Sequence, residues 1–247
     1  MLHGTVRLYV EAALSPGASV AIGPEQAHYA VNVMRRRPGD AVFLFNGRDG
    51  EWRAVVTDGN RRICRLSVEE RVRPQSSAPN LWLLFAPLKR LRLDWLIEKA
   101  TELGVGRLQP VMTRHTVAQR TNAERLKARA VEAAEQCRRL TVPEVAASVT
   151  LDRLLAVWSA DRRLLLCDFA DPHTPPILDA LKGAEPGPWA VFAGPEGGFA
   201  EDERAALLGR SFVVPARLGP GILRAETAAV AALSVWQAVL GEGAVEA

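Results

Sequence analysis

The chain has 247 residues, of which 48% are hydrophobic, with a formal net charge of +3 and a mean hydropathy of zero. This composition is typical of a globular protein with one large domain or two modest ones. No apolar run is long enough to span a bilayer, and the first residues form no hydrophobic signal segment, so we expect a cytoplasmic protein without membrane contact.

The distribution of charge and of cysteine narrows the possible functions. Residues 1–73 contain 11 arginines and 8 acidic residues, so the whole positive excess lies in the first third of the chain. A locally basic module beside a neutral one is typical of nucleic-acid binding, although so small an excess also fits an ordinary solvated surface. The cysteines are scattered without a Cys-x-x-Cys pair, which predicts neither a disulfide framework nor a metal site.

The first 73 residues predict a small β-module. Asn-Gly and Asp-Gly turn signals separate short runs of strand-forming residues. The predicted strands are 6–10, 18–22, 41–45, 51–56 and 61–69. Five such strands usually close into a barrel or a curled sheet. Residues 26–37 interrupt them with a predicted short helix that ends in Arg35, Arg36 and Arg37, which could bind phosphates or could be a solvated helix end.

Residues 73–79 form the predicted linker, because they are polar and bracketed by prolines. Beyond it, strand and helix patterns alternate. The predicted strands are 81–86, 108–112, 164–167, 189–193 and 212–214. The predicted helices are 92–103, 121–139, which starts at a capping box from Thr121 to Glu124, one that starts at the acidic run 201–203, and 226–240. This alternation predicts a second domain, 74–247, built on a parallel sheet with helices on both faces.

Two glycine-rich loops follow the last two predicted strands. They are Gly194-Pro195-Glu196-Gly197-Gly198-Phe199 and 218–223, and Arg224-x-Glu226-Thr227 follows the second. Glycine exposes main-chain groups, and ligands bind at the carboxyl edge of parallel sheets, so the pair favours a site for a flat polar ligand such as adenine or ribose. A single loop of this kind would more often be an ordinary turn. The motifs of P-loop enzymes, dinucleotide-binding folds and serine hydrolases are absent.

Further motifs accompany these loops, namely 6–10, His28 with 33–35 and 38–40, 45–47, 98–105, and 135–137 with Arg139 and 142–144. Together they resemble the RsmE family of bacterial 16S ribosomal RNA uridine-N3 methyltransferases, in the SPOUT superfamily. The resemblance covers nearly the whole chain, and the two loops in this order are its most specific part. It implies an α/β fold in which a small N-terminal PUA-like β-barrel precedes a SPOUT-type parallel sheet with a trefoil knot. It also implies a homodimer.

The resemblance implies S-adenosylmethionine as cofactor, no metal, and 16S ribosomal RNA or the assembled small ribosomal subunit as partner. The implied cofactor-binding residues are Leu166, Gly194, Pro195, Glu196, Gly198, Leu218, Gly219, Ile222 and Leu223. The implied RNA-binding residues are Arg7, His28, Arg35, Arg36 and Arg139. His28 could equally be structural; no second ligand lies at a spacing that would make it a metal site.

Arg224 and Glu226 are the predicted catalytic residues. Loss of the N3 proton spreads negative charge over both uridine carbonyl oxygens, and a guanidinium at Arg224 would stabilise it. Glu226 could act as a base, although anchoring Arg224 or the helix start is the favoured role. The alternative function is a non-catalytic RNA-binding ribosome assembly factor, and a nicotinamide-dependent oxidoreductase is a distant third.

The chain departs from the family pattern in three places. Gly221 stands where the family usually has Arg, Arg138 replaces a common Gly, and residues 113–116 read Thr-Arg-His-Thr in place of a Ser-Glu-Arg-Ser type run. The first change removes a cation near the expected site, and Arg138 could replace that charge. The third change puts in doubt any role that the family pattern would assign to residues 113–116.

Overall fold

The computed structural model describes residues 5–60, 62–117, 121–168, 171 and 173–241. The chain divides into two compact units. The first holds the described residues up to Ser77 together with Ala134–Val142, and the second holds Ala78–Ala133 and the chain from Pro143 onward. The predicted boundary at 73/74 lies close to the first break, but no sequence pattern indicates that residues 134–142 belong to the first unit.

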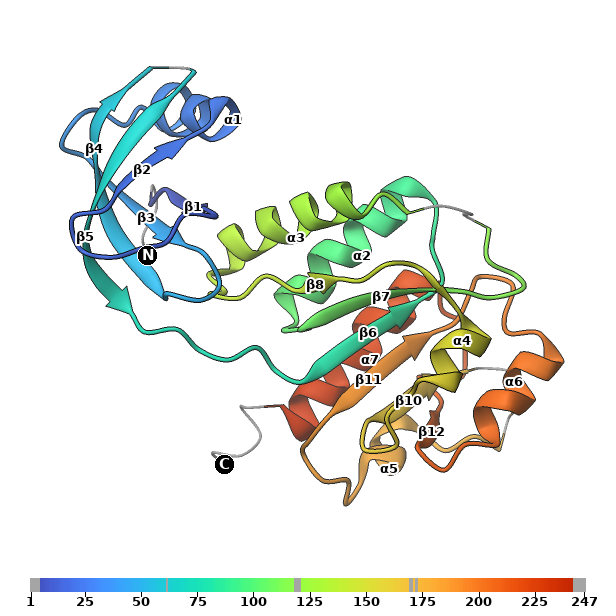
Figure 1. The fold of residues 1–247 in the computed structure, drawn as a ribbon. Helices are drawn as coiled ribbons and strands as arrows, with labels where there is room; N and C mark the ends of the chain where they lie inside the picture. Colours follow the sequence, from blue (N-terminus) through green and yellow to red (C-terminus); the bar gives the residue numbers. More distant parts are fainter. Residues whose placement is uncertain (1–4, 61, 118–120, 169–170, 172, 242–247) are drawn as a thin grey trace. The chain divides into compact units, whose positions relative to one another are not determined.

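The first unit is built on a five-stranded sheet in the order β1-β3-β4-β5-β2 (Figure 1). Its strands are β1 (Arg7–Tyr9), β2 (Ser19–Ile22), β3 (Ala41–Phe45), β4 (Glu51–Gly59) and β5 (Cys64–Arg73). Only the β1–β3 pair is parallel. Residues of both edge strands share one apolar core, so the sheet curls around a common interior. The predicted helix is a short α1 (Pro24–Ala27) continued by a π-helical segment, η1 (His28–Val33).

Arg7 lies inside this unit, with only 8% of its surface exposed. It pairs with Glu51 and donates to the carbonyl oxygens of Ala134, at 2.6 Å, and of Arg139. Its guanidinium also lies 3.6 Å from the centre of the Phe45 ring. Burial lowers the pKa of Arg7, and the hydrogen bond with Glu51 partly offsets this. Residues 134–142 are therefore tied to the β-sheet through one buried cation.

The second unit is a parallel sheet in the order β12-β10-β11-β6-β7-β8, with β9 also paired to β7. Its strands are β6 (Leu81–Phe85), β7 (Arg107–Met112), β8 (Glu144–Val145), β9 (Val149–Thr150), β10 (Arg163–Cys167), β11 (Trp189–Ala193) and β12 (Val213–Ala216). Its helices are α2 (Arg90–Glu102), α3 (Ala123–Cys137, whose end enters the first unit), α4 (Leu151–Ala156), α5 (Ile177–Leu181), α6 (Glu201–Leu208) and α7 (Ala225–Leu240).

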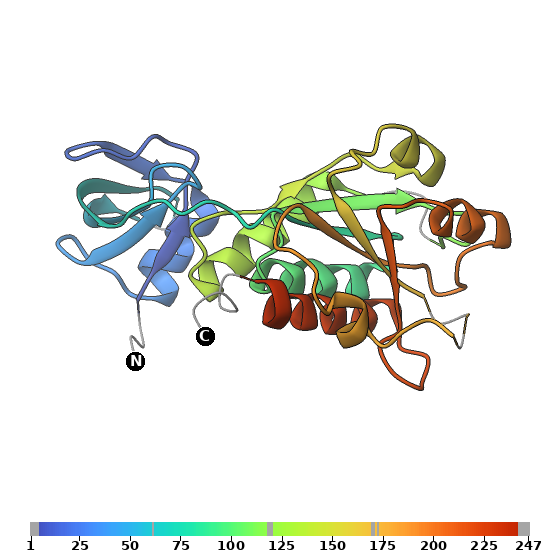
Figure 2. The same cartoon turned by 90° about the horizontal axis from the view of Figure 1, so that it is seen from below.

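Helices cover both faces of this sheet, as the alternating pattern predicted (Figure 2). Leucines of α4 and α6 share a core cluster with β10 and β11 on one face. On the other face α7 packs against α2, α5 and β11. The short α4, α5, β8 and β9 were not predicted, because elements of two to six residues carry too little periodicity to be recognised.

The start of α3 differs in detail from the prediction. The side chain of Asn122 accepts the backbone N–H of Arg125 at 3.0 Å, so Asn122 is the residue that caps the helix. Thr121, the predicted cap, instead shares a 2.8 Å hydrogen bond with Ser148. Throughout the described part of the chain, no helix is long and apolar enough to cross a membrane.

Candidate active site

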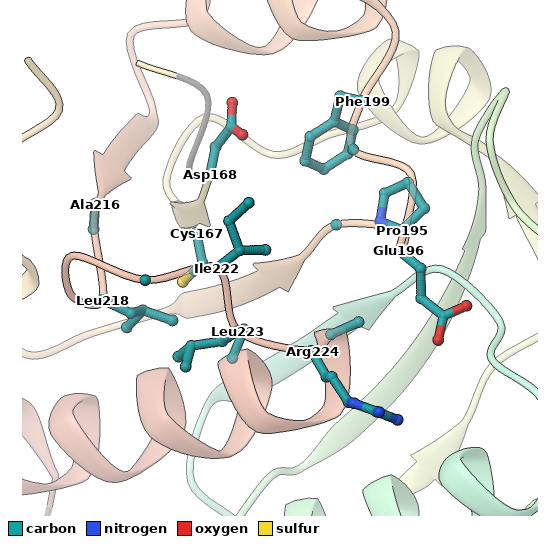
Figure 3. A pocket seen from close by; sticks show the side chains of 15 residues that line it. Cys167, Asp168, Pro195, Glu196, Phe199, Ala216, Leu218, Ile222, Leu223 and Arg224 are labelled. Atoms are coloured by element: carbon teal, nitrogen blue, oxygen red, sulfur yellow. The ribbon is translucent and has the colours of Figure 1, made fainter. Parts of the chain in front are cut away.

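The site forms where three neighbouring strands end. β12, β10 and β11 are adjacent and parallel, and Cys167 at the end of β10 is in register with Ala193 on one side and Ala216 on the other. The chain segments that leave these three strands therefore emerge side by side. Figure 3 shows them around one pocket, with the start of α7 below. Such a carboxyl edge is where open α/β sheets bind ligands.

The pocket has a volume of about 320 Å³, near the lower end of the range of small-molecule sites, about 300–1,000 Å³. Seven of the nine predicted cofactor-binding residues line it: Gly194, Pro195, Glu196, Gly198, Leu218, Ile222 and Leu223. The same walls include Cys167, Asp168, Phe199, Ala216, Gly221, Arg224, Ala225 and Ala228. The two glycine-rich loops thus converge, as their positions after parallel strands predicted.

The two remaining predicted cofactor-binding residues are not pocket-lining. Leu166 is fully buried, and its side chain belongs to the core beneath the sheet edge. Gly219 has a φ of 155° and lies between Leu218 and Gly221, which do line the pocket.

The first loop is packed too closely for any other residue at Gly194. A Cβ there would lie 2.7 Å from the Phe199 ring. That ring packs edge-on against the buried Phe192, with ring centres 5.0 Å apart. On the other side, His115 Nδ1 lies 3.0 Å from the Gly198 carbonyl oxygen, and since a carbonyl can only accept, this nitrogen carries the proton. Residues 113–116 therefore support the loop even though they depart from the family pattern.

Arg114 holds the same region from its other side. Its backbone N–H donates to Glu203 at 2.8 Å, and its guanidinium donates to Asp202 at 2.6 Å, both on the first turn of α6. The hydrogen bond from Arg114 lowers the pKa of Asp202. The loop that carries Gly198 is thereby anchored to β7 through residues 113–116.

Two acidic residues at the pocket are held by arginines far away in the sequence. Glu196 pairs with Arg92 on α2, and Arg92 Nε also lies 3.6 Å from Glu226 Oε1 on α7. Asp168 pairs with Arg204 on α6 at 2.6 Å. These ion pairs fix the loop after β11 and the residue after β10 to the helices that flank them.

Cys167 forms part of the pocket wall. Burial, reinforced by the neighbouring Asp168 carboxylate, raises the pKa of its thiol to about 12. The thiol is therefore uncharged at neutral pH and acts as a small apolar surface, not as a nucleophile.

The sequence matches two families of known proteins. Residues 75–237 match the RNA methyltransferase domain family, and residues 22–72 match the RNA methyltransferase PUA domain. The chain is also 31% identical to the ribosomal RNA small subunit methyltransferase E of Rickettsia conorii, over 92% of this chain and 93% of that protein. This chain belongs to the ribosomal RNA small subunit methyltransferase E family. The resemblance inferred from the motifs is thus confirmed.

Solved structures agree with this membership. A methyltransferase from Legionella pneumophila, in complex with the bound cofactor SAM, superposes with a TM-score of 0.82 at 28% identity, covering 95% of this chain and 97% of that one. The ribosomal RNA small subunit methyltransferase E from Neisseria gonorrhoeae, bound to S-adenosyl methionine, gives 0.79 at 26% identity, covering 94% and 97%. The PUA domain that the motifs implied is present, and it precedes an α/β RNA methyltransferase domain.

The two predicted catalytic residues lie in different surroundings. Arg224 is exposed, precedes the first turn of α7 and lines the pocket (Figure 3). Glu226 is 8% exposed and is not one of the lining residues. It forms an ion pair with Arg92, and its Oε2 has no hydrogen-bond partner among the described residues. This placement fits an anchoring role for Glu226, in which its carboxylate holds the guanidinium of Arg92.

The predicted RNA-binding residues all lie in the first unit, but they differ in exposure. Arg35 and His28 are exposed, and Arg36 and Arg139 are half-buried. His28 shares a 2.9 Å hydrogen bond with Asn32, and Arg139 donates to Thr141 at 2.9 Å. Arg7 is the exception, because its buried guanidinium already binds one carboxylate and two carbonyl oxygens. Direct contact between Arg7 and RNA does not fit this burial.

Arg35 and Arg138 share an unusual backbone conformation. Their φ angles are 54° and 62°, and no other non-glycine residue of the described chain has a positive φ. The left-handed region costs most residues about 1–2 kcal/mol. Arg138 follows the end of α3, where glycine commonly takes this conformation. The departure from glycine at this position therefore places an exposed arginine where backbone strain opposes it.

Several residues of the site were missed by the sequence reasoning. Asp168 could have been found, because it is the first residue after a correctly predicted strand that ends at the ligand-binding edge. Phe199 ends the first glycine-rich loop, and the motif itself does not indicate that its ring lines the pocket. Arg92 carries no local signal, since its acidic partners lie 104 and 134 residues further along the chain. Among the described residues, no group of three or more His, Cys, Asp and Glu side chains could hold a metal ion.

Proposed function

We propose that this chain transfers the methyl group of S-adenosylmethionine to N3 of a uridine in 16S ribosomal RNA. The observation that carries the proposal is the convergence of two glycine-rich loops and Arg224 on one pocket. Membership of the ribosomal RNA small subunit methyltransferase E family supports the reaction class and the RNA. The relatives bound to S-adenosyl methionine support the cofactor.

The residues at the pocket fit S-adenosylmethionine. The aliphatic and aromatic side chains of Leu218, Leu223 and Phe199 offer apolar surface for the adenine. Gly194 and Gly198 expose main-chain groups for its polar edges and for the ribose. The carboxylates of Glu196 and Asp168 are each paired with an arginine, and their remaining lone pairs can accept hydrogen bonds from the ammonium and hydroxyl groups of this ligand. When bound, the cofactor supplies an electrophilic methyl group, and the protein's task is then to align the acceptor.

Arg224 has the chemistry that the acceptor requires. Uridine N3 is a poor nucleophile until its proton leaves, and the resulting charge spreads over O2 and O4. Arg224 lines the pocket beside the cofactor loop, and its guanidinium, which points away from the labelled Ile222 and Phe199 in Figure 3, would stabilise this anion once turned towards the acceptor. Glu226 holds Arg92 and, through it, the loop at Glu196, so we assign it a positioning role.

We further propose that the active form is a homodimer, that the α/β domain contains a trefoil knot, and that the enzyme acts in the cytoplasm on ribosomal RNA or on the assembled small subunit. Support for these points comes from the family motifs, of which the loops 194–199 and 218–223 are the most specific. The exposed apolar side chains of Ile222 and Leu223, which are 81% and 40% exposed, would be covered by a ligand or a second subunit.

The test compares small-subunit RNA from cells with and without this chain by mass mapping, followed by methyl transfer with the purified protein. Arg224→Ala should lower the transfer rate by about 10²–10³-fold, the effect of losing one oxyanion-stabilising group, and should leave the cofactor affinity unchanged. Arg224→Lys, which keeps the charge, should retain more activity. Equal activity in Arg224→Ala would remove this residue from the mechanism, and absence of cofactor binding by calorimetry would favour a non-catalytic RNA-binding factor.

A further inference from the structure

The first unit contains a second and larger cavity, formed by the end of η1, the sheet and the last turn of α3. Its volume is about 800 Å³, which lies within the range of about 300–1,000 Å³ for sites that hold a small organic ligand. Tyr29, Met34, Phe43, Arg73, Gln136 and Arg138 are among its lining residues. All of them belong to the first unit, so the cavity is complete within one compact body.

One wall of this cavity is aromatic and apolar. Tyr29, Met34 and Phe43 are each half-buried, so part of each side chain remains open to a ligand. Tyr29 and Met34 also pack against the core of the unit, which fixes their positions. Rings held in this way are typical platforms for stacking bases, because every base presents a flat π-face.

The other wall carries two arginines and an amide. Arg73 donates to the Arg138 carbonyl oxygen at 3.1 Å, so the two residues are adjacent. The Glu51 carboxylate pairs with two arginines, the buried Arg7 and Arg73. The distance from the Arg73 guanidinium to Glu51 Oε2 is 3.5 Å. One carboxylate cannot neutralise two guanidinium groups. Arg138 is exposed and has a left-handed backbone, a conformation that glycine adopts without strain. The cavity lining therefore holds three guanidinium groups, of Arg7, Arg73 and Arg138, against the two carboxylates of Glu51 and Glu135, which leaves an excess of one positive charge.

We propose that this cavity binds one unpaired nucleotide of the RNA substrate, with its base on the Tyr29, Met34 and Phe43 wall and its phosphate on Arg73 and Arg138. The inference rests on the proposed function in one respect, that the substrate is RNA. A paired nucleotide is excluded chemically, because a duplex covers the faces of its bases and offers only grooves and backbone. Gln136, with a donor and an acceptor on one exposed amide, is placed to read the edge of an unstacked base.

The experiment measures binding of fluorescein-labelled oligouridine to the full-length protein by fluorescence anisotropy over a range of salt concentrations. Arg138→Gly removes the charge and suits the left-handed backbone, while Arg138→Lys keeps the charge. Arg210→Ala, an exposed arginine outside the cavity, is the matched control. Tyr29→Leu removes the stacking ring but keeps an apolar side chain, and thermal melting shows whether each variant is folded.

Arg138→Gly should reduce the slope of log affinity against log salt by about 0.7, the value for one phosphate contact with a single strand. Arg138→Lys and Arg210→Ala should leave this slope unchanged. Tyr29→Leu should weaken binding by about fivefold to a hundredfold without changing the slope, because stacking is not ionic. Annealing oligoadenosine to the probe should weaken binding to the wild type and remove the difference between wild type and Tyr29→Leu.

Photocross-linking with 4-thiouridine in the probe gives a second readout, which should place the link on the peptide that carries Tyr29 or on the one that carries Gln136. The proposal is overturned if Arg138→Gly and Tyr29→Leu bind oligouridine as the wild type does, or if no cross-link falls on a residue of the cavity. A cavity that instead binds peptide from a ribosomal protein would give that same negative result. Methyl transfer by the wild type on small subunits is measured separately, so loss of the proposed function would not be confused with loss of this site.

Discussion

Replacing Gly194 by alanine tests whether close packing against Phe199 determines the shape of the cofactor loop, because the structure shows which atoms the added Cβ would contact. In Gly194→Ala the new Cβ would lie 2.7 Å from Cε2, 3.0 Å from Cζ and 3.3 Å from Cδ2 of Phe199. Phe199 cannot move freely, since its ring packs against Phe192 within the core and also lines the pocket. The ring or the loop must therefore shift, and either shift changes the shape of the pocket.

The size of the effect follows from the cost of overpacking a close-packed region, about 1–3 kcal/mol. If that cost falls on the bound state, the affinity for S-adenosylmethionine should drop by about fivefold to a hundredfold, at about 1.4 kcal/mol for each factor of ten. Isothermal titration calorimetry measures this directly. Gly221→Ala is the matched control, because Gly221 also lines the pocket but a Cβ there meets nothing within 4 Å.

A double mutant separates the contact with Phe199 from other effects of the alanine. Phe199→Ala removes the ring that the new Cβ would meet, so Gly194→Ala should cost much less in that background. The coupling between the two changes should reach at least about 0.5 kcal/mol, as for residues in direct contact. Wild-type affinity in Gly194→Ala, or strictly additive losses in the double mutant, would refute the claim that Phe199 limits this loop.

Three further predictions concern charge. Replacing Arg35 and Arg36 by alanine should weaken RNA binding and lower its salt slope by about 0.7 for each lost contact with single-stranded RNA; an unchanged slope would count against this unit as the RNA-binding part. Arg92→Gln should weaken cofactor binding, because it releases the Glu196 carboxylate, whereas Arg92→Lys should preserve it; calorimetry on both variants decides. The Cys167 thiol has its pKa raised from 9.0 to about 12 in the folded protein, so the unfolded chain loses this proton first. The free energy of unfolding should therefore fall as pH rises from about 9 towards 12, and less so in Cys167→Ala; equal pH profiles by denaturant titration would argue against the shift.

The parts of the site that were predictable from the sequence are those that depend on chain order. Apolar runs predicted the positions of the strands. Because ligands bind at the carboxyl edge of parallel strands, the loops 194–199 and 218–223 were predicted to lie together. The same rule would have led to Asp168, had it been applied to the strand that ends at Cys167. Local pattern and sheet geometry were sufficient here, because adjacent parallel strands bring their ends together whatever the side chains are.

Interactions between distant charges were not predictable. Arg7 looked like one more cation in a basic module, yet it is buried because Glu51 and two main-chain carbonyl groups surround it. Arg92 looked like an ordinary residue in the first turn of a helix, but it joins the cofactor loop to α7. In both cases the arginine's role is set by partners on other elements, and only the folded chain brings those partners within reach.

The placement of Arg7 also has a consequence for the order in which this protein can mature during synthesis. The carbonyl groups that complete its surroundings follow 127 and 132 residues later in the chain. At about 5–20 residues per second, the ribosome adds them roughly 6–26 seconds after Arg7 itself. Until then, the nascent β-sheet carries a guanidinium with only part of its final hydrogen bonding, so the first unit can be completed only after residues 134–139 have been synthesised.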